Sequence, residues 1–170
     1  MRSGMRSYVY VIIVMFFITL SSCSTLLKTP TVIMNSSLVG YKYVYVNPTQ
    51  EKIVSKGVTS GGKYYSQSSV TTESFNPADV ISGILMKQGY IILPQLNPDL
   101  VEETFIVNYG ESGKRNVGLG YTLEVTIQII SAKSNELICS SIAEGIGDDE
   151  RDDLRNAITR ALESLFYNSK

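Results

Sequence analysis

The chain has 170 residues, with 15 Lys and Arg against 16 Asp and Glu, two cysteines and no histidine. This length suits one domain, and the near-neutral charge argues against nucleic-acid binding, which needs a basic face. Because histidine is the commonest metal ligand and the commonest general base, its absence leads us to expect no enzyme activity, no catalytic residue, no metal site and no cofactor.

The N-terminus has the pattern of an export signal. Arg2 and Arg6 precede an apolar stretch over residues 8–20. A membrane-spanning helix needs about 20 apolar residues, so this stretch is short for a permanent anchor and typical of a signal-peptide core. We therefore expect a signal peptide over residues 1–22.

A cysteine follows the apolar stretch directly, in the sequence Leu20, Ser21, Ser22 and Cys23. These four residues resemble the lipobox of bacterial lipoproteins, in which the cysteine thiolate accepts a diacylglycerol group and the cysteine becomes the first residue. The resemblance implies lipidation at Cys23 and stable anchoring, because several acyl chains hold where a single chain binds marginally. The alternative is an uncleaved signal anchor with a chance cysteine. A lipidated Cys23 also leaves Cys139 without a disulfide partner in the chain.

The segment after the lipobox reads as a tether followed by one domain. Residues 23–39 are weakly patterned and predict a lipidated tether, and we expect a single domain over residues 40–170. Tyr41–Val46 has aromatic and β-branched residues that predict the first strand. Residues 55–74 are rich in Ser, Thr and Gly and predict a flexible loop.

Two tyrosines stand in the middle of this predicted loop. Tyr64 and Tyr65 indicate a short hairpin at most, and no core is evident around them. We therefore regard them as a candidate binding surface for a glycan or a peptide.

The middle of the chain predicts one helix and two strands. Asn76 is a good helix cap, and Pro77 suits the first helical position, with Gly89 as the stop. Residues 90–93 predict a buried strand and residues 103–109 another. Gly110 to Gly118 is a charged, glycine-containing stretch that predicts a turn.

The C-terminal part has the clearest periodicity. Residues 121–129 alternate apolar and polar side chains, which predicts a strand with one buried face, and residues 137–143 predict its antiparallel partner. Asp148 and Asp149 open a final helix whose apolar stripe has helical spacing: Leu154, Ala157, Ile158, Ala161, Leu162, Leu165 and Phe166. Together the elements predict an α+β fold, a mainly antiparallel mixed sheet of about five strands with two helices on one face.

Three segments of this pattern resemble the DUF4136-type lipoproteins, a group of bacterial envelope proteins. They are Tyr41-Lys-Tyr-Val-Tyr45, the stretch from Ile84-Leu-Met-Lys-Gln-Gly-Tyr90 to Phe105-Ile-Val-Asn-Tyr109, and Gly120-Tyr-Thr-Leu-Glu-Val-Thr126 with the final helix. One departure is Cys139, at a position where family members often carry Trp. The resemblance implies the fold and an envelope location, and it implies no reaction.

Three motifs suggest chemistry only superficially. Cys139 has no histidine to activate it and is better explained as a small buried apolar residue. The acidic run 148–153 lacks the spacing of a calcium loop and suits the first turn of a helix. Residues 110–114 are too short for a phosphate loop.

The sequence leaves two hypotheses open. The first is a non-catalytic lipoprotein that binds or scaffolds another envelope protein, with strand 41–46 or 103–109 as an edge for a partner strand. Ser24 is not the Asp that retains enterobacterial lipoproteins at the inner membrane, so we expect the outer membrane, facing the periplasm. The second is an envelope enzyme or small-ligand carrier with a pocket near residues 55–74. Its carboxylates would come from Glu73, Glu124 and Glu144.

Overall fold

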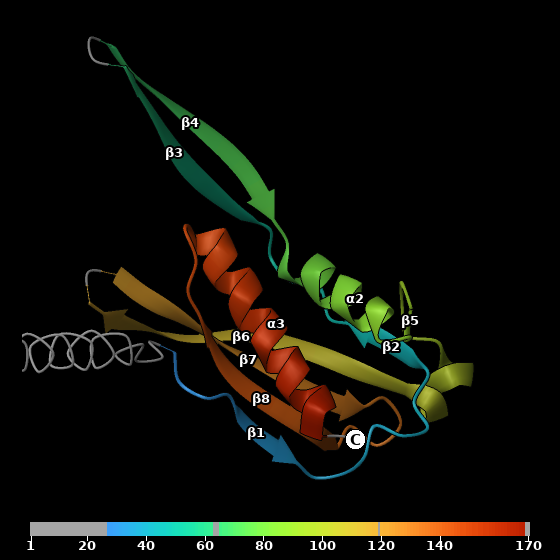
Figure 1. Ribbon diagram of the computed structural model, residues 1–170. Helices are drawn as coiled ribbons and strands as arrows, with labels where there is room; N and C mark the ends of the chain where they lie inside the picture. Colours follow the sequence, from blue (N-terminus) through green and yellow to red (C-terminus); the bar gives the residue numbers. More distant parts are fainter. Residues whose placement is uncertain (1–26, 63–64, 119, 169–170) are drawn as a thin grey trace, which may run out of the picture.

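The protein is described by a computed structural model, which covers residues 27–62, 65–118 and 120–168 (Figure 1). The predicted signal peptide, the lipobox and Cys23 lie outside these residues. The elements are, in chain order, β1 (Thr31–Met34), β2 (Tyr43–Val46), β3 (Lys52–Gly62), β4 (Tyr65–Phe75), α2 (Pro77–Lys87), β5 (Ile91–Ile92), the short 3-10 helix η1 (Pro98–Glu103), β6 (Thr104–Val117), β7 (Gly120–Ser131), β8 (Leu137–Gly145) and α3 (Glu150–Asn168).

A mixed sheet of six strands forms the body of the domain, in the order β1-β8-β7-β6-β2-β5. Strand β2 runs parallel to both of its neighbours, and the other pairs are antiparallel. Helices α2 and α3 lie side by side on one face of this sheet (Figure 1). The predicted α+β architecture is therefore confirmed, with six strands where about five were expected.

The additional strand is β1, which corrects the predicted tether. Residues 31–34 pair antiparallel with β8, so that Val32 lies opposite Ser141. Leu38 is also buried, with 4% of its surface exposed. The tether was expected to extend to residue 39 because the segment is short and weakly patterned. Its β-branched residues are enough for an edge strand once β8 supplies the hydrogen-bonding partner.

The segment 55–74 forms an extended β-hairpin where a loop was predicted. Strands β3 and β4 pair along their whole length, from Lys52 opposite Phe75 to Gly62 opposite Tyr65. The hairpin projects away from the six-stranded sheet (Figure 1). Backbone hydrogen bonds between two strands do not require alternating apolar side chains. The Ser/Thr-rich sequence therefore gave no pattern from which the hairpin could be predicted. Tyr64 lies outside the described residues, and the side chains of residues 54–73 are likewise not described.

Strand β6 is much longer than predicted. It continues to Val117, through most of the stretch 110–118 that was expected to be a turn, and Gly118, with its φ of +57°, follows the end of the strand. A bulge between Glu111 and Gly113 accommodates the irregular register with β7.

The two predicted edge strands lie inside the sheet. Strands β2 and β6 both have neighbours on two sides, and the edges are β1 and β5. The stretch 90–93, expected to be a buried strand, is reduced to the short edge strand β5, where Ile91 is 54% exposed.

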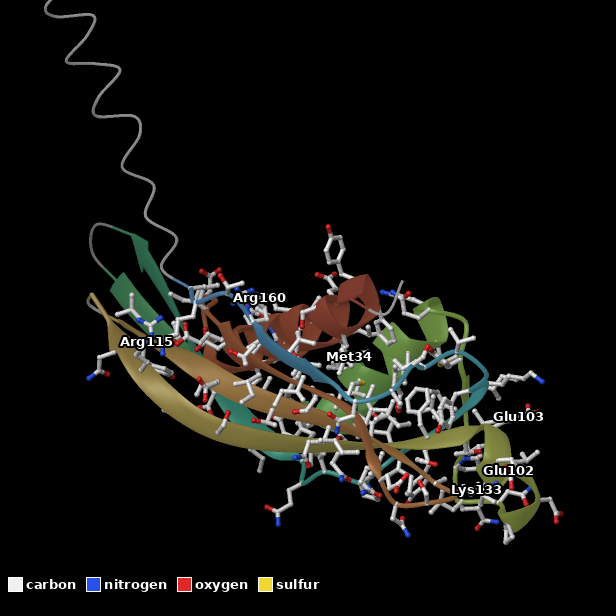
Figure 2. The ribbon with its side chains drawn as sticks, turned by 90° about the horizontal axis from the view of Figure 1, so that it is seen from below. Met34, Glu102, Glu103, Arg115, Lys133 and Arg160 are labelled. Carbon is white, nitrogen blue, oxygen red and sulfur yellow. The ribbon has the colours of Figure 1, made fainter. Side chains whose placement is uncertain are left out.

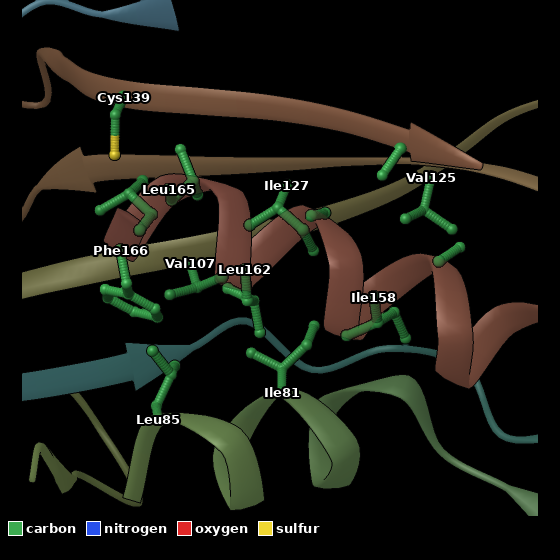
Figure 3. Close-up of a cluster of buried hydrophobic side chains, with 14 of the residues drawn as sticks. Ile81, Leu85, Val107, Val125, Ile127, Cys139, Ile158, Leu162, Leu165 and Phe166 are labelled. Atoms are coloured by element: carbon green, nitrogen blue, oxygen red, sulfur yellow. The ribbon is translucent and has the colours of Figure 1, made fainter. Parts of the chain in front are cut away.

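The core lies between the helices and the sheet (Figure 3). Every residue of the predicted apolar stripe on α3 is buried, and Cys139 packs among them as a small apolar side chain, as expected. The alternation of β7 is confirmed from Leu123 onward, since Leu123, Val125, Ile127 and Ile129 are buried. At the start of the strand it is wrong, because Tyr121 is 37% exposed and Thr122 is buried. None of the helices in the described part of the chain is long and apolar enough to cross a membrane.

Both helices begin where the capping residues predicted. The side chain of Asn76 accepts a hydrogen bond from the backbone N–H of Ala78 at the start of α2. The side chain of Asp149 accepts one from the N–H of Asp152 at the start of α3. The acidic run 148–153 thus belongs to a helix start.

Candidate functional site

A buried carboxylate joins three distant parts of the chain. Glu144 lies near the end of β8, and only 3% of its side chain is exposed. Arg115, near the end of β6, donates from Nε to Oε1 at 2.6 Å and from Nη2 to Oε2 at 2.5 Å. This two-pronged geometry is the strongest way in which an arginine binds a carboxylate.

The same carboxylate holds the N-terminal segment. The backbone N–H of Lys28 donates to Glu144 Oε2 at 3.0 Å, and its ammonium lies 3.6 Å from Oε1. Arg160 of α3 donates to the backbone carbonyls of Glu144 and of Lys28, the second at 2.8 Å. We call Lys28, Arg115, Glu144 and Arg160 the Glu144 cluster. Figure 2 shows Arg115 and Arg160 near the start of β1.

The cluster keeps Glu144 ionised. The guanidinium of Arg115 lowers the pKa of Glu144 to about 2, against the opposing effect of burial, and the backbone N–H of Lys28 adds to the lowering. A carboxyl group that titrates so low does not hold a proton near neutral pH. Glu144 is therefore unsuited to be a general acid.

This bears on the three carboxylates considered for catalysis. Glu124 lies directly opposite Glu144 in the register of β7 and β8. The oxygens of Glu144, however, are engaged by Arg115 and Lys28, and the side chain of Glu73 is not described. The arrangement resembles a structural ion-pair cluster more than an acid and nucleophile pair.

A second cluster fixes the base of the hairpin. The ammonium of Lys52 on β3 lies 2.6 Å from Glu111 on β6 and 3.5 Å from Glu150 on α3. Tyr109 donates to Glu111 at 3.1 Å, and burial, with Glu111 nearby, raises the pKa of Tyr109. The hairpin is thus attached to both the sheet and the last helix.

The other strand of the hairpin is held at the start of α2. Thr49 donates to the side chain of Asn76 at 2.7 Å, and Ala78 donates to Thr49 at 3.0 Å. Phe75, the last residue of β4, is buried in the core. The hairpin base is therefore fixed on both sides.

Surface hollows among the described residues are shallow. One of about 470 Å³ is lined by Val39, Tyr41, Gln88, Tyr90 and Ile91, and one of about 430 Å³ by residues that include Asn35 and Ser134. Neither contains Glu124 or Glu144. A pocket formed by the side chains of residues 55–74 would lie outside the described part.

The predicted site residues fall into two groups. Leu20, Ser21, Ser22, Cys23 and Tyr64 lie outside the described residues, and only the backbone of Tyr65 is described. Within the described chain no group of three or more Cys, Asp or Glu is placed to hold a metal ion.

Sequence reasoning missed Lys28, Arg115 and Arg160. Glu144 was considered only as a catalytic carboxylate. The partners are separated by 29 positions between Arg115 and Glu144 and by 116 between Lys28 and Glu144, and no local spacing relates them. Basic residues scattered along a near-neutral chain carry no signal of a common cluster.

Comparisons with known proteins give a distant likeness in fold. No family model matches the chain, and no curated protein matches it. Among solved structures, a methionine-substituted form of the PelC dodecamer from Paraburkholderia phytofirmans is 14% identical with a TM-score of 0.44, covering 80% of this chain and 96% of that chain. Another PelC dodecamer from the same organism is 13% identical with a TM-score of 0.40, covering 81% of this chain and 94% of that chain.

Proposed function

We propose that this protein is a bacterial lipoprotein anchored through Cys23, with a non-catalytic binding or scaffolding role in the cell envelope. The lipobox pattern of residues 20–23 is its basis in the sequence. The resemblance to the DUF4136-type lipoproteins leads to the same proposal. Ser24 favours the outer membrane, facing the periplasm.

The observation that carries the proposal furthest is the attachment of Lys28. It stands shortly after Cys23, and its backbone is bound by both Glu144 and Arg160. In a domain that is held at a membrane through its N-terminus, any force on the domain is transmitted through the N-terminal segment. The attachment of this segment to the domain must therefore be stable. The Glu144 cluster meets that need with charge-assisted hydrogen bonds, which are about twice as strong as neutral ones.

Lipidation is tested by metabolic labelling with an alkyne fatty acid in a bacterial host, followed by separation of inner and outer membranes. We expect the wild type to be labelled and to fractionate with the outer membrane. Cys23→Ser should lose the label and leave the membrane fraction. Cys139→Ser is the matched control and should keep both. Label on Cys23→Ser would overturn the proposal.

The β3–β4 hairpin is the surface that we propose for the partner. It pairs only with itself among the described strands, and an isolated two-stranded hairpin is marginally stable in water. Its base is fixed by Lys52 and Thr49. An arm fixed at one end, with Tyr65 opposite Gly62 at its other end, suits the binding of an envelope protein.

Site-specific crosslinking in intact cells tests this surface. A photoreactive residue at Ser60 on β3 should give a discrete crosslinked protein, because this position lies on the hairpin. The same residue at Ser134, in the turn between β7 and β8, is the matched control and should not give this product. Identical products from both positions would contradict a role for the hairpin.

A further inference from the structure

The chain between the predicted lipid and the domain is short. Cys23 and Lys28 are separated by five peptide units, which extend at most about 18 Å. Strand β7 alone has 12 residues and is about 40 Å long. A lipid on Cys23 therefore keeps Lys28 close to the bilayer. Because this connection is shorter than the domain, it restricts which end of the domain can face the membrane.

The Glu144 cluster decides which end of the domain is held there. Lys28 is bound to Glu144, and Glu144 to Arg115 near the end of β6. The turn between β6 and β7 lies at one end of the molecule (Figures 1 and 2), and Lys28 is bound to Glu144, opposite Glu124 in the half of β7 that follows this turn. Glu102 and Lys133, which pair at 2.7 Å, lie at the opposite end (Figure 2).

The held end carries side chains that suit a lipid headgroup layer. Lys114 is exposed, and its ammonium lies 4.9 Å from the ring centre of Tyr121, which is 37% exposed. Lysine and tyrosine are both favoured at membrane interfaces. The ammonium of lysine pairs with phosphate groups, and the ring of tyrosine is amphipathic. Asp148 and Asp149 line the same hollow as Tyr121, so this end carries charges of both signs, and Lys114 is the group there that can pair with a headgroup phosphate.

We infer that the end of the domain formed by Lys28 and the β6–β7 turn faces the phospholipid headgroups, with the Lys114 and Tyr121 pair in contact with their phosphates. The inference rests on the proposed lipidation of Cys23. The orientation follows from the short chain and the fixed position of Lys28. The contact follows from the exposed side chains at the same end.

Fluorescence quenching on vesicles tests the orientation. The full-length acylated protein is reconstituted into phosphatidylethanolamine and phosphatidylglycerol vesicles that contain a lipid with a nitroxide on its headgroup. A single fluorophore is attached in turn through Asn116→Cys beside the β6–β7 turn, Ile33→Cys on β1 and Leu96→Cys shortly before η1. We expect strong loss of fluorescence at position 116, less at 33 and none at 96. Equal or stronger quenching at 33 or 96 would overturn the orientation.

A charge reversal tests the contact. Lys114→Glu should weaken the quenching at position 116, whereas Lys87→Glu, an exposed lysine at the end of α2, should leave it unchanged. An unchanged signal with Lys114→Glu would overturn the headgroup contact. The mass of the purified protein separates the two proposals: absent acyl chains refute the lipidation itself, whereas an acylated protein with the wrong quenching pattern refutes only this inference.

Discussion

Arg115 and Glu144, 29 positions apart, face each other in a two-pronged ion pair with distances of 2.6 and 2.5 Å. Glu144 is buried, whereas Arg115 is partly exposed. Through Lys28 and Arg160 this pair connects the N-terminal segment to the sheet and to α3. The ion pair therefore links β6 to β8, and the same carboxylate binds the N-terminal segment to both strands.

Replacing the carboxylate should destabilise the domain. Glu144→Gln removes the charge from hydrogen bonds with Arg115 and Lys28, and we expect the free energy of unfolding to fall by about 2 kcal/mol, the range for hydrogen bonds to charged groups. Urea denaturation followed by circular dichroism measures the change. Glu124→Gln, at the opposite position on β7, is the matched control and should have a much smaller effect. Equal losses in both variants would contradict the role assigned to Glu144.

Acid should destabilise the protein partly through Glu144. Its pKa falls from 4.5 to about 2 on folding, so its stabilising contribution is complete above pH 4.5 and is lost as the pH falls toward 2. The urea midpoint of the wild type should therefore decrease over this range more steeply than that of Glu144→Gln. Burial raises the pKa of Asp153, which acts in the opposite direction, but it does so in both proteins. Parallel pH profiles for the two would refute the assignment.

Gly145 should tolerate no side chain, because β8 and α3 meet there backbone to backbone. A Cβ at this position would lie 1.9 Å from the carbonyl oxygen of Asp153 and 2.4 Å from the nitrogen of Ala157. We expect Gly145→Ala to lower the free energy of unfolding by about 3 kcal/mol or more.

The matched control for this substitution is Gly83→Ala in α2. A Cβ there meets nothing within 4 Å, and alanine favours the helix by about 1 kcal/mol. In thermal denaturation, the melting temperature should therefore fall for Gly145→Ala and rise for Gly83→Ala. A Gly145→Ala variant as stable as the wild type would show that the contact between β8 and α3 is loose.

The thiol of Cys139 should be inert in the folded protein. It is buried in the core, and burial raises its pKa to about 12, so the reactive thiolate is scarce at neutral pH. In a Cys23→Ser background, iodoacetamide followed by mass spectrometry should modify Cys139 in urea and not in native buffer. Rapid modification of the native protein would mean that the core opens near α3.

The sequence alone was sufficient for the features that depend on local patterns. The apolar stripe from Leu154 to Phe166 and the alternation of β7 repeat with the period of their own element. The caps at Asn76 and Asp149 act on backbone groups only a few residues away. Such features can be read from a short window of sequence, and with them the α+β class and the burial of Cys139.

Only the tertiary structure decided the position of β1, the long β3–β4 hairpin and the Glu144 cluster. Residues 31–34 are a short segment that becomes a strand because β8 supplies its hydrogen-bonding partners, and residues 55–74 lack an apolar pattern but become strands because β3 and β4 pair with each other. Lys28 and Glu144 meet across 116 positions because β8 crosses the sheet beside the N-terminal segment. Contacts between residues so far apart follow from strand order, and strand order is a property of the whole packed chain.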